Sequence, residues 1–63
     1  MGLKILMIKA GLTQKTLAEK IGTYQQKVSY WLNGGQPDYY YVPKIAEATG
    51  TTIADVVYAI IDN

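Results

Sequence analysis

The sequence predicts an all-α fold, a compact bundle of five short helices. Three observations support this prediction. Apolar residues recur at spacings of three and four along most of the chain, and strict alternation of apolar and polar residues is scarce. Glycine follows each of the first four apolar stripes, alone or as Asn-Gly-Gly, where a helix would end. The 63 residues contain no internal repeat and no low-complexity linker, so we expect residues 1–63 to form a single domain.

The first two helices are expected over residues 3–10 and 14–21. Each is followed by a glycine, Gly11 or Gly22, which tolerates the left-handed conformation common at helix C-termini. Thr13 is suited to cap the second helix, because its hydroxyl can accept a hydrogen bond from a free backbone N–H. The residues expected to face the core are Leu3, Leu6, Met7 and Ala10 in the first helix and Leu17, Ala18 and Ile21 in the second.

The third helix is expected to begin at residue 23 or 24 and to end at residue 32 or 33, where Asn-Gly-Gly interrupts the pattern. Residues 36–38 are expected to form a loop. The fourth helix should begin near residue 41 and end at Gly50, with Pro43 in its first turn, where a missing N–H is tolerated. The inward residues are expected to be Val28, Trp31 and Leu32 in the third helix and Val42, Ile45 and Ala46 in the fourth.

The fifth helix is expected from Thr52 to about residue 61. Thr52 and Asp55 have the spacing of a capping box, with Asp in place of the usual Glu. The segment is rich in β-branched residues, which also favour strands. Its apolar residues nevertheless fit one helix face better than a period of two, so we predict a helix. These residues are Ile53, Val56, Val57, Ile60 and Ile61.

The composition excludes several classes of protein. Without cysteine or histidine, the chain has no disulfide, no thiolate or imidazole metal ligand and no histidine general base. No pair of acids is placed to converge, so we expect no enzyme activity, no metal, no cofactor and no small-molecule ligand. The first ten residues are too short and too interrupted by lysine to span a membrane, and they lack a signal-peptide cleavage site. We therefore expect no membrane partner and a cytoplasmic location.

The second and third predicted helices are joined by a minimal turn around Gly22. Such short connections containing glycine are typical of the helix-turn-helix, here residues 13–33. Ala18 is small where the two helices would cross, which permits their close approach. The apolar positions expected to lock the two helices together are Leu17, Ala18, Ile21, Val28 and Trp31.

The stretch Leu12–Gly34, L-T-Q-K-T-L-A-E-K-I-G-T-Y-Q-Q-K-V-S-Y-W-L-N-G, resembles the Cro/CI (XRE-like) family of phage and bacterial repressors. The family pattern runs roughly L-T-Q-x-x-L-A-x-x-[IL]-G-[VT]-x-Q-x-x-[VI]-S-x-W-x-x-G, and nearly every fixed position is filled. V-P-K-I-A-E-A-T-G-T-T-I-A-D-V-V resembles the family's fourth and fifth helices more weakly. The resemblance implies a lambda-repressor-like DNA-binding domain.

Two adjacent glutamines, Gln25 and Gln26, begin the third helix, where the resemblance places base contacts in the major groove. A glutamine carboxamide can pair with both N6 and N7 of adenine, so we expect A·T pairs in the bound half-site. Tyr24 and Ser29 are expected to join them at base edges, although Ser29 could instead contact phosphate. The alternative is that both glutamines belong to an ordinary solvated surface.

Phosphate contacts are expected from residues around these base contacts. The resemblance assigns Gln14 to the phosphate backbone, packed against Gln25, and the helix N-terminus there favours an anion. Such contacts fix register without reading sequence. The full set of expected phosphate contacts is Gln14, Lys15, Lys27, Tyr30 and Asn33. The two lysines could equally be ordinary surface residues, whereas Trp31 is interpreted as core.

Two further groups of residues are interpreted as a possible dimer surface. Tyr39 and Tyr40 could contact DNA, but we favour a dimer or core contact, since tyrosine is enriched at protein interfaces. Ile5 and Ile8 take positions where relatives carry charged residues, and exposed isoleucines would need cover. We expect that cover from the last helix, within the chain or across a dimer, through Val57, Ile60 and Ile61.

The sequence thus predicts a small transcriptional repressor of the Cro type. It would bind a pseudo-palindromic operator in double-stranded DNA as a homodimer and occlude a promoter. A second interpretation is a protein-interaction module, such as an antitoxin or adaptor, built on the same helices. The net charge of +1 and the absence of arginine favour this alternative, because DNA-binding proteins more often have a clear basic excess.

Overall fold

The computed structural model describes residues 2–61, which form five α-helices and one short 3₁₀ turn, with no strand among them. The all-α prediction is confirmed, and the last segment is a helix rather than a strand. The elements are α1 (Gly2–Lys9), α2 (Gln14–Ile21), α3 (Gln25–Leu32), η1 (Tyr39–Tyr41), α4 (Val42–Thr49) and α5 (Ile53–Ile61).

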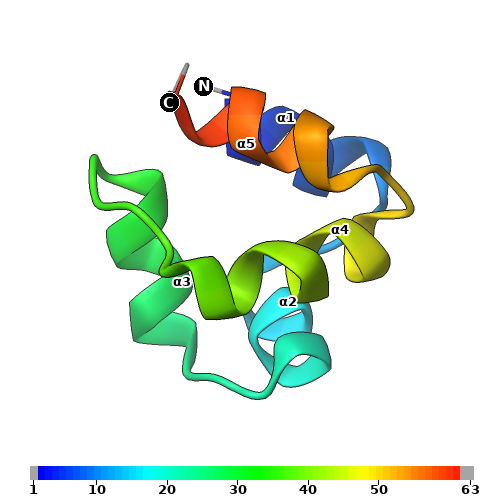
Figure 1. The fold of residues 1–63 in the computed structure, drawn as a ribbon. Coiled ribbons are helices and arrows are strands. Elements are labelled where there is room, and N and C mark those ends of the chain that lie inside the picture. The colour runs from blue at the N-terminus through cyan, green and yellow to red at the C-terminus, as the bar shows by residue number, and fades with distance from the viewer. Residues whose placement is uncertain (1, 62–63) are drawn as a thin grey trace.

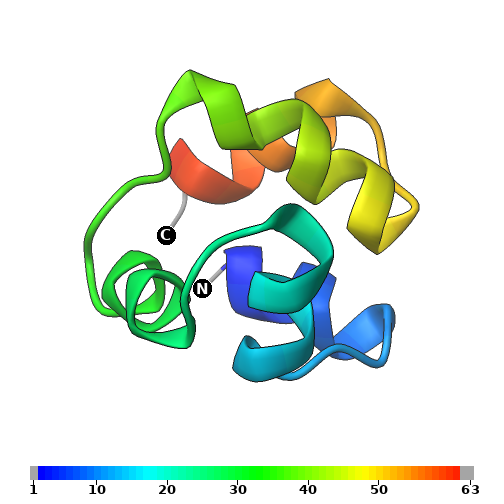
Figure 2. The same ribbon diagram turned by 90° about the horizontal axis from the view of Figure 1, so that it is seen from below.

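The helices form two packed pairs, with α4 between them. In Figure 1, α1 and α5 lie side by side at one end of the molecule, and α2 and α3 lie towards the other. α4 contacts both α2 and α5, and Figure 2 shows it from below with the α2–α3 turn beside it. At Gly2 a Cβ atom would lie 2.6 Å from the Cα of Ala59, so α1 and α5 approach too closely there for a larger residue.

The core is apolar and draws on every helix. Among residues 2–61 no polar or charged side chain is buried. The fully buried side chains of largest volume are Trp31, Leu3, Leu17, Ile45, Val28 and Val56. Burial of this kind is the main stabilising term for so small a domain. It also fixes how α3 sits on α2, because Val28 and Trp31 occupy one side of α3 and leave its other side in solvent.

The structure corrects part of the predicted burial. Ala10 lies just outside α1 and, like Leu6, is only half-buried. In α5 the buried residues are Val56 and Ala59, whereas Ile53 and Ile61 are exposed. Ile61 lies about 140° around the helix from Val56. Ile53 is the first residue of α5, and since helical side chains tilt towards the N-terminus, it extends beyond the packed part of the helix.

Four helices end with the same hydrogen bond. At the end of α2, Gly22 has φ +78°, and the N–H of Thr23 donates to the carbonyl of Ala18 at 2.9 Å. This is the Schellman arrangement, which satisfies carbonyls that the end of a helix leaves free. The equivalent donor–acceptor pairs are Leu12 to Met7, Gly35 to Tyr30 and Thr51 to Ala46.

Two helices also begin with reciprocal caps. At α2 the Thr13 hydroxyl accepts from the N–H of Thr16 at 3.1 Å, and the Thr16 hydroxyl accepts from the N–H of Thr13 at 2.8 Å. At α5 the N–H of Asp55 donates to the Thr52 hydroxyl, and the N–H of Thr52 donates to the Asp55 carboxylate, both at 3.1 Å. The predicted cap at Thr13 and the capping box at Thr52 are confirmed.

Replacing Gly22 with alanine tests the turn between α2 and α3. A Cβ there meets nothing within 4 Å, so the cost is conformational and should be about 1–2 kcal/mol of unfolding free energy. Gly22→Asn should lose less, since asparagine tolerates the left-handed region better. Urea denaturation measures both. A Gly22→Ala protein as stable as wild type would show that the turn does not require glycine.

Candidate nucleic-acid interface

The side of α3 opposite the core presents polar side chains to solvent. Gln25, Gln26 and Lys27 are exposed, and Ser29 is half-buried. At about 100° per residue, Gln25 and Ser29 lie about 40° apart on the helix. Lys27 lies about 160° from Ser29, on the other edge of the exposed side. α3 therefore has two polar edges, which contact different parts of the molecule.

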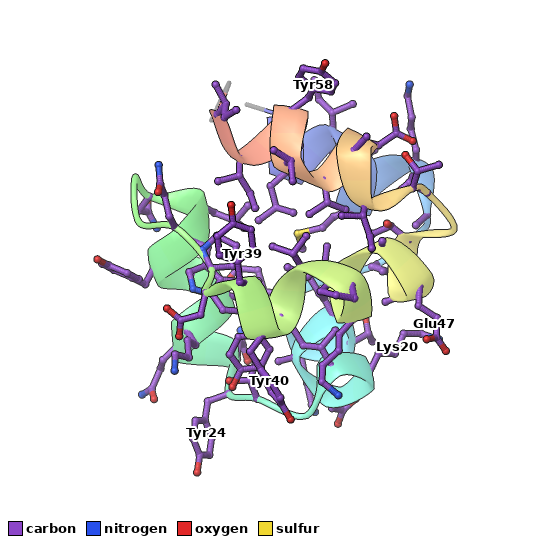
Figure 3. All side chains as sticks on the ribbon, in the orientation of Figure 1. Lys20, Tyr24, Tyr39, Tyr40, Glu47 and Tyr58 are labelled. Carbon is purple, nitrogen blue, oxygen red and sulfur yellow. The ribbon has the colours of Figure 1, made fainter. Side chains whose placement is uncertain are left out.

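The first edge adjoins the start of α2 and forms a shallow depression of about 440 Å³. This polar depression brings together side chains from two helices and the turn between them. Its lining residues are Gln14, Tyr24, Gln25, Gln26 and Ser29. All four predicted base contacts and one predicted phosphate contact thus share one concave surface. In Figure 3, Tyr24 extends away from the body of the protein at this end, and it is 76% exposed.

The N-terminus of α3 has no side-chain cap. The N-cap residue is Tyr24, and its side chain makes no capping hydrogen bond. The carbonyl of Tyr24 accepts from the N–H groups of Lys27 at 3.0 Å and Val28 at 3.3 Å. The first N–H groups of a helix have no acceptor within it, and the helix dipole favours an anion beside them. This end of α3 therefore suits a negatively charged partner.

Lys27 lies on the second edge of α3, and it and two other residues that the sequence assigned to phosphate each contact a neighbour within the chain. The Lys27 ammonium lies 5.5 Å from the centroid of the Tyr41 ring. A Cβ at Gly35 would lie within 2.3 Å of the Tyr30 ring, so that ring packs directly over the glycine backbone. The side-chain amide of Asn33 donates to the carbonyl of Ser29 at 2.8 Å. A phosphate bound by Asn33 would compete with this bond.

Lys44 of α4 is linked to Lys27 through the Tyr40 and Tyr41 rings, and it is not among the expected phosphate contacts. Its ammonium lies 5.1 Å from the centroid of the Tyr40 ring. The signal is present in the sequence, because residues four apart on a helical turn are neighbours and Lys44 follows Tyr40 by four. The expectation of a dimer or core contact for Tyr40 did not include this neighbour.

The residues interpreted as a dimer surface line two depressions that share Ile61. Tyr39, Val57, Ile60 and Ile61 line a depression of about 220 Å³ between the loop before η1 and α5. Ile5 and Ile61 line a second, of about 690 Å³, where Tyr58 also lies. Ile8 and Tyr40 line neither. Val57 and Ile60 pack partly against the core, but Ile5 and Ile8 stay exposed, so the last helix does not cover them within the chain.

Residues 2–61 contain neither a metal-ligand cluster nor a membrane-spanning helix. No group of three or more acidic, histidine or cysteine residues there is arranged to hold a metal ion. No helix in the same range is long and apolar enough to cross a membrane.

Comparison with known families identifies the fold. A family model described as helix-turn-helix matches residues 3–56, which is most of the chain. The chain therefore belongs to this family, and its domain is of the XRE/Cro-like type. The family consists of DNA-binding transcription regulators. No curated protein and no solved structure matches the chain.

The capping bond of Asn33 leads to a prediction about stability. Asn33→Ala should lower the unfolding free energy by about 0.5–1.5 kcal/mol, because it removes the donor to Ser29 at the end of α3. Lys15→Ala is the control: Lys15 is exposed, and its replacement should change stability by less than about 0.5 kcal/mol. Thermal or urea unfolding measures both. Equal stability of the two variants would contradict the capping role.

Proposed function

We propose that the protein is a sequence-specific transcriptional repressor of the Cro type, which inserts α3 into the major groove and occludes a promoter. The observation that carries this proposal is the polar depression, where Gln14 from α2 meets Gln25, Gln26 and Ser29 from α3. In a helix-turn-helix complex the start of the second helix meets base edges while the first helix crosses the backbone. The depression would therefore provide base contacts and backbone contacts from one surface.

The two glutamines are the proposed base-contacting residues. Each carboxamide has a donor and an acceptor, which match N7 and N6 of adenine in the major groove. Both side chains are exposed, and neither takes part in a described hydrogen bond within the chain. Ser29 and Tyr24 border the same depression and are proposed to contact bases beside them.

Backbone contacts are proposed around this centre. Gln14 and Lys15 begin α2, and the uncapped N-terminus of α3 offers further N–H donors for phosphate. The interface is thus rich in neutral donors and poor in cations. Since the salt dependence of DNA binding reflects the phosphates that cations neutralise, we expect it to be shallow for this protein.

The glutamines give the most direct test of sequence recognition. Gln25→Ala and Gln26→Ala should each weaken operator binding by about 1–3 kcal/mol and relax the preference at one A·T pair. Both sites are exposed, so stability should change little. Gln36→Ala is the matched control for the loss of an exposed amide: Gln36 lies outside the polar depression, so sequence preference should not change, although Gln36 borders the depression at Tyr39 and its loss could alter self-association. Unaltered affinity and preference in both α3 variants would refute the assignment.

A homodimer on a pseudo-palindrome is the second part of the proposal. Two recognition helices about 34 Å apart must face the same side of the duplex, so the contact between copies has to lie beside α3. The depression lined by Tyr39, Ile60 and Ile61 lies on that side, between α5 and the loop that follows α3. The surface around Ile5 and Tyr58 lies at the α1–α5 end, and Figure 3 shows Tyr58 far from Tyr24.

One exposed residue from each depression distinguishes these surfaces. Tyr39, 87% exposed, lines only the first depression, and Ile5, 47% exposed, lines only the one around Tyr58. Tyr39→Lys should weaken self-association by roughly tenfold or more, because it introduces an unpaired charge into an apolar contact. Ile5→Lys should leave self-association unchanged. Sedimentation with and without a two-half-site duplex measures this. If Ile5→Lys alone disrupted the dimer, the contact would be at the α1–α5 end instead.

A protein-interaction module is the alternative function, and one observation favours it. Ile5, Ile8, Tyr58 and Ile61 leave apolar surface exposed near the α1–α5 pair, around the larger depression. Exposed apolar patches mark protein contacts more often than DNA contacts. Salt-dependent retention of duplex DNA separates the two functions, because an antitoxin or adaptor that acts only on proteins would show none. For either function we propose no catalytic activity.

A further inference from the structure

Two lysines, Lys27 on the second edge of α3 and Lys44 on α4, lie against tyrosine rings of η1. The Lys27 ammonium is 5.5 Å from the Tyr41 ring centroid, and the Lys44 ammonium is 5.1 Å from that of Tyr40. The Tyr40 and Tyr41 rings meet edge to face, with centroids 5.1 Å apart. The four side chains form one continuous series, Lys27–Tyr41–Tyr40–Lys44, which we term the cation–π row.

The cation–π row is fixed to the core at one point. Tyr41 is half-buried, and its ring centroid lies 5.3 Å from that of Trp31, which is almost completely buried. Tyr40 is 69% exposed, and both lysines are exposed. Tyr41 therefore anchors the row to the core, while both lysines at its ends lie in solvent. The rings hold two ammonium groups that would otherwise move freely on long side chains.

The position of the row relative to the polar depression suggests its role. Gln25 and Ser29 border the depression shared with Gln14, whereas Lys27 turns towards η1 on the opposite edge of α3. α3 is thus flanked by neutral donors on one side and by two held cations on the other. Lys44 also borders a depression with Lys20 and Glu47, both of which are labelled in Figure 3. Two lysines and one glutamate give this depression a net positive charge.

We propose that the cation–π row is a second DNA-contact edge, in which Tyr40 and Tyr41 are positioning residues that hold Lys44 and Lys27 for two phosphates across the groove from Gln14. The inference rests on the proposed DNA-binding function and deepens it. A lysine that is already held loses less side-chain entropy when it meets a phosphate. The row therefore compensates for the absence of arginine and the net charge of only +1.

The salt dependence of DNA binding tests the two lysines. The probe is a mixed-sequence duplex of about two helical turns, which reports backbone contacts. Lys27→Gln and Lys44→Gln should each lower the slope of log affinity against log salt concentration by about one. Lys4→Gln, the same charge change on the exposed side of α1, should leave the slope unchanged. A Lys44→Gln protein with the wild-type slope would overturn the proposal.

The tyrosine rings are tested with all charges retained. Tyr40→Leu should weaken binding about two- to fivefold, whereas Tyr40→Phe, which keeps the ring, should bind as wild type does. Tyr40→Leu combined with Lys44→Gln should bind no more weakly than Lys44→Gln alone, because the ring acts through the lysine. Unfolding curves check that the variants fold, and the exposure of Tyr40 favours this.

Three outcomes contradict the proposal in different ways. If Tyr40→Phe loses as much affinity as Tyr40→Leu, the hydroxyl contacts DNA directly and the ring is not a positioning group. If the wild-type protein binds no duplex at any salt concentration, the proposed function fails, and the second edge fails with it. If the wild-type protein binds DNA and the Tyr40 and Lys44 variants bind it with the same affinity and salt dependence, the second-edge proposal alone is overturned.

Discussion

The turn at Gly22 and the packing of α2 against α3 determine the rest of the structure. Gly22 adopts φ +78°, so the helical path of α2 ends within one residue and the chain turns towards α3. Ala18, 2% exposed, is small enough for close contact between the helices, and Trp31 fills the space beneath α3. Because this geometry is fixed by buried apolar contacts, the residue types on the polar side of α3 can vary without disturbing it. The same packing places Gln14 and Gln25 on one depression.

The candidate interface differs from the usual electrostatic pattern of a DNA-binding domain. Its concave part is lined by amides and hydroxyls, and the cations lie at its margins. Neutral donors contribute to specificity through geometry, whereas cations contribute affinity that does not depend on sequence. A domain of this composition should therefore have modest affinity for non-specific DNA and derive more of its specific affinity from base contacts. Dimerisation would then add affinity only at paired half-sites.

The sequence predicted the helices well, because residues at the helix ends determine locally where each helix begins and stops. Gly22 and Gly50 mark C-termini, and Thr13 and Thr52 mark N-termini, so few residues were needed to place α2, α4 and α5. The spacing of three and four also identified most of the core. Ile53 was misplaced because periodicity assigns a face but does not show where neighbouring helices stop.

The site was only partly predictable for a related reason. That Gln14 and Gln25 share one surface follows from the turn, which is local in sequence. The direction of Lys27 depends on Tyr41, which reaches α3 through a loop that carries no periodic pattern. The apolar surface predicted around Ile5 divides into two because α5 lies between its parts. Side-chain direction across a tertiary contact could not be obtained from spacing alone.

Selection from a random duplex library at moderate salt would show whether α3 recognises a DNA sequence. Recognition by Gln25 and Gln26 in a dimer should enrich an inverted repeat with A·T pairs in half-sites about one helical turn apart. A single enriched short site would keep the recognition role but contradict the dimer. No enrichment, together with no salt-dependent retention of any duplex, would contradict DNA recognition and support a protein-interaction module.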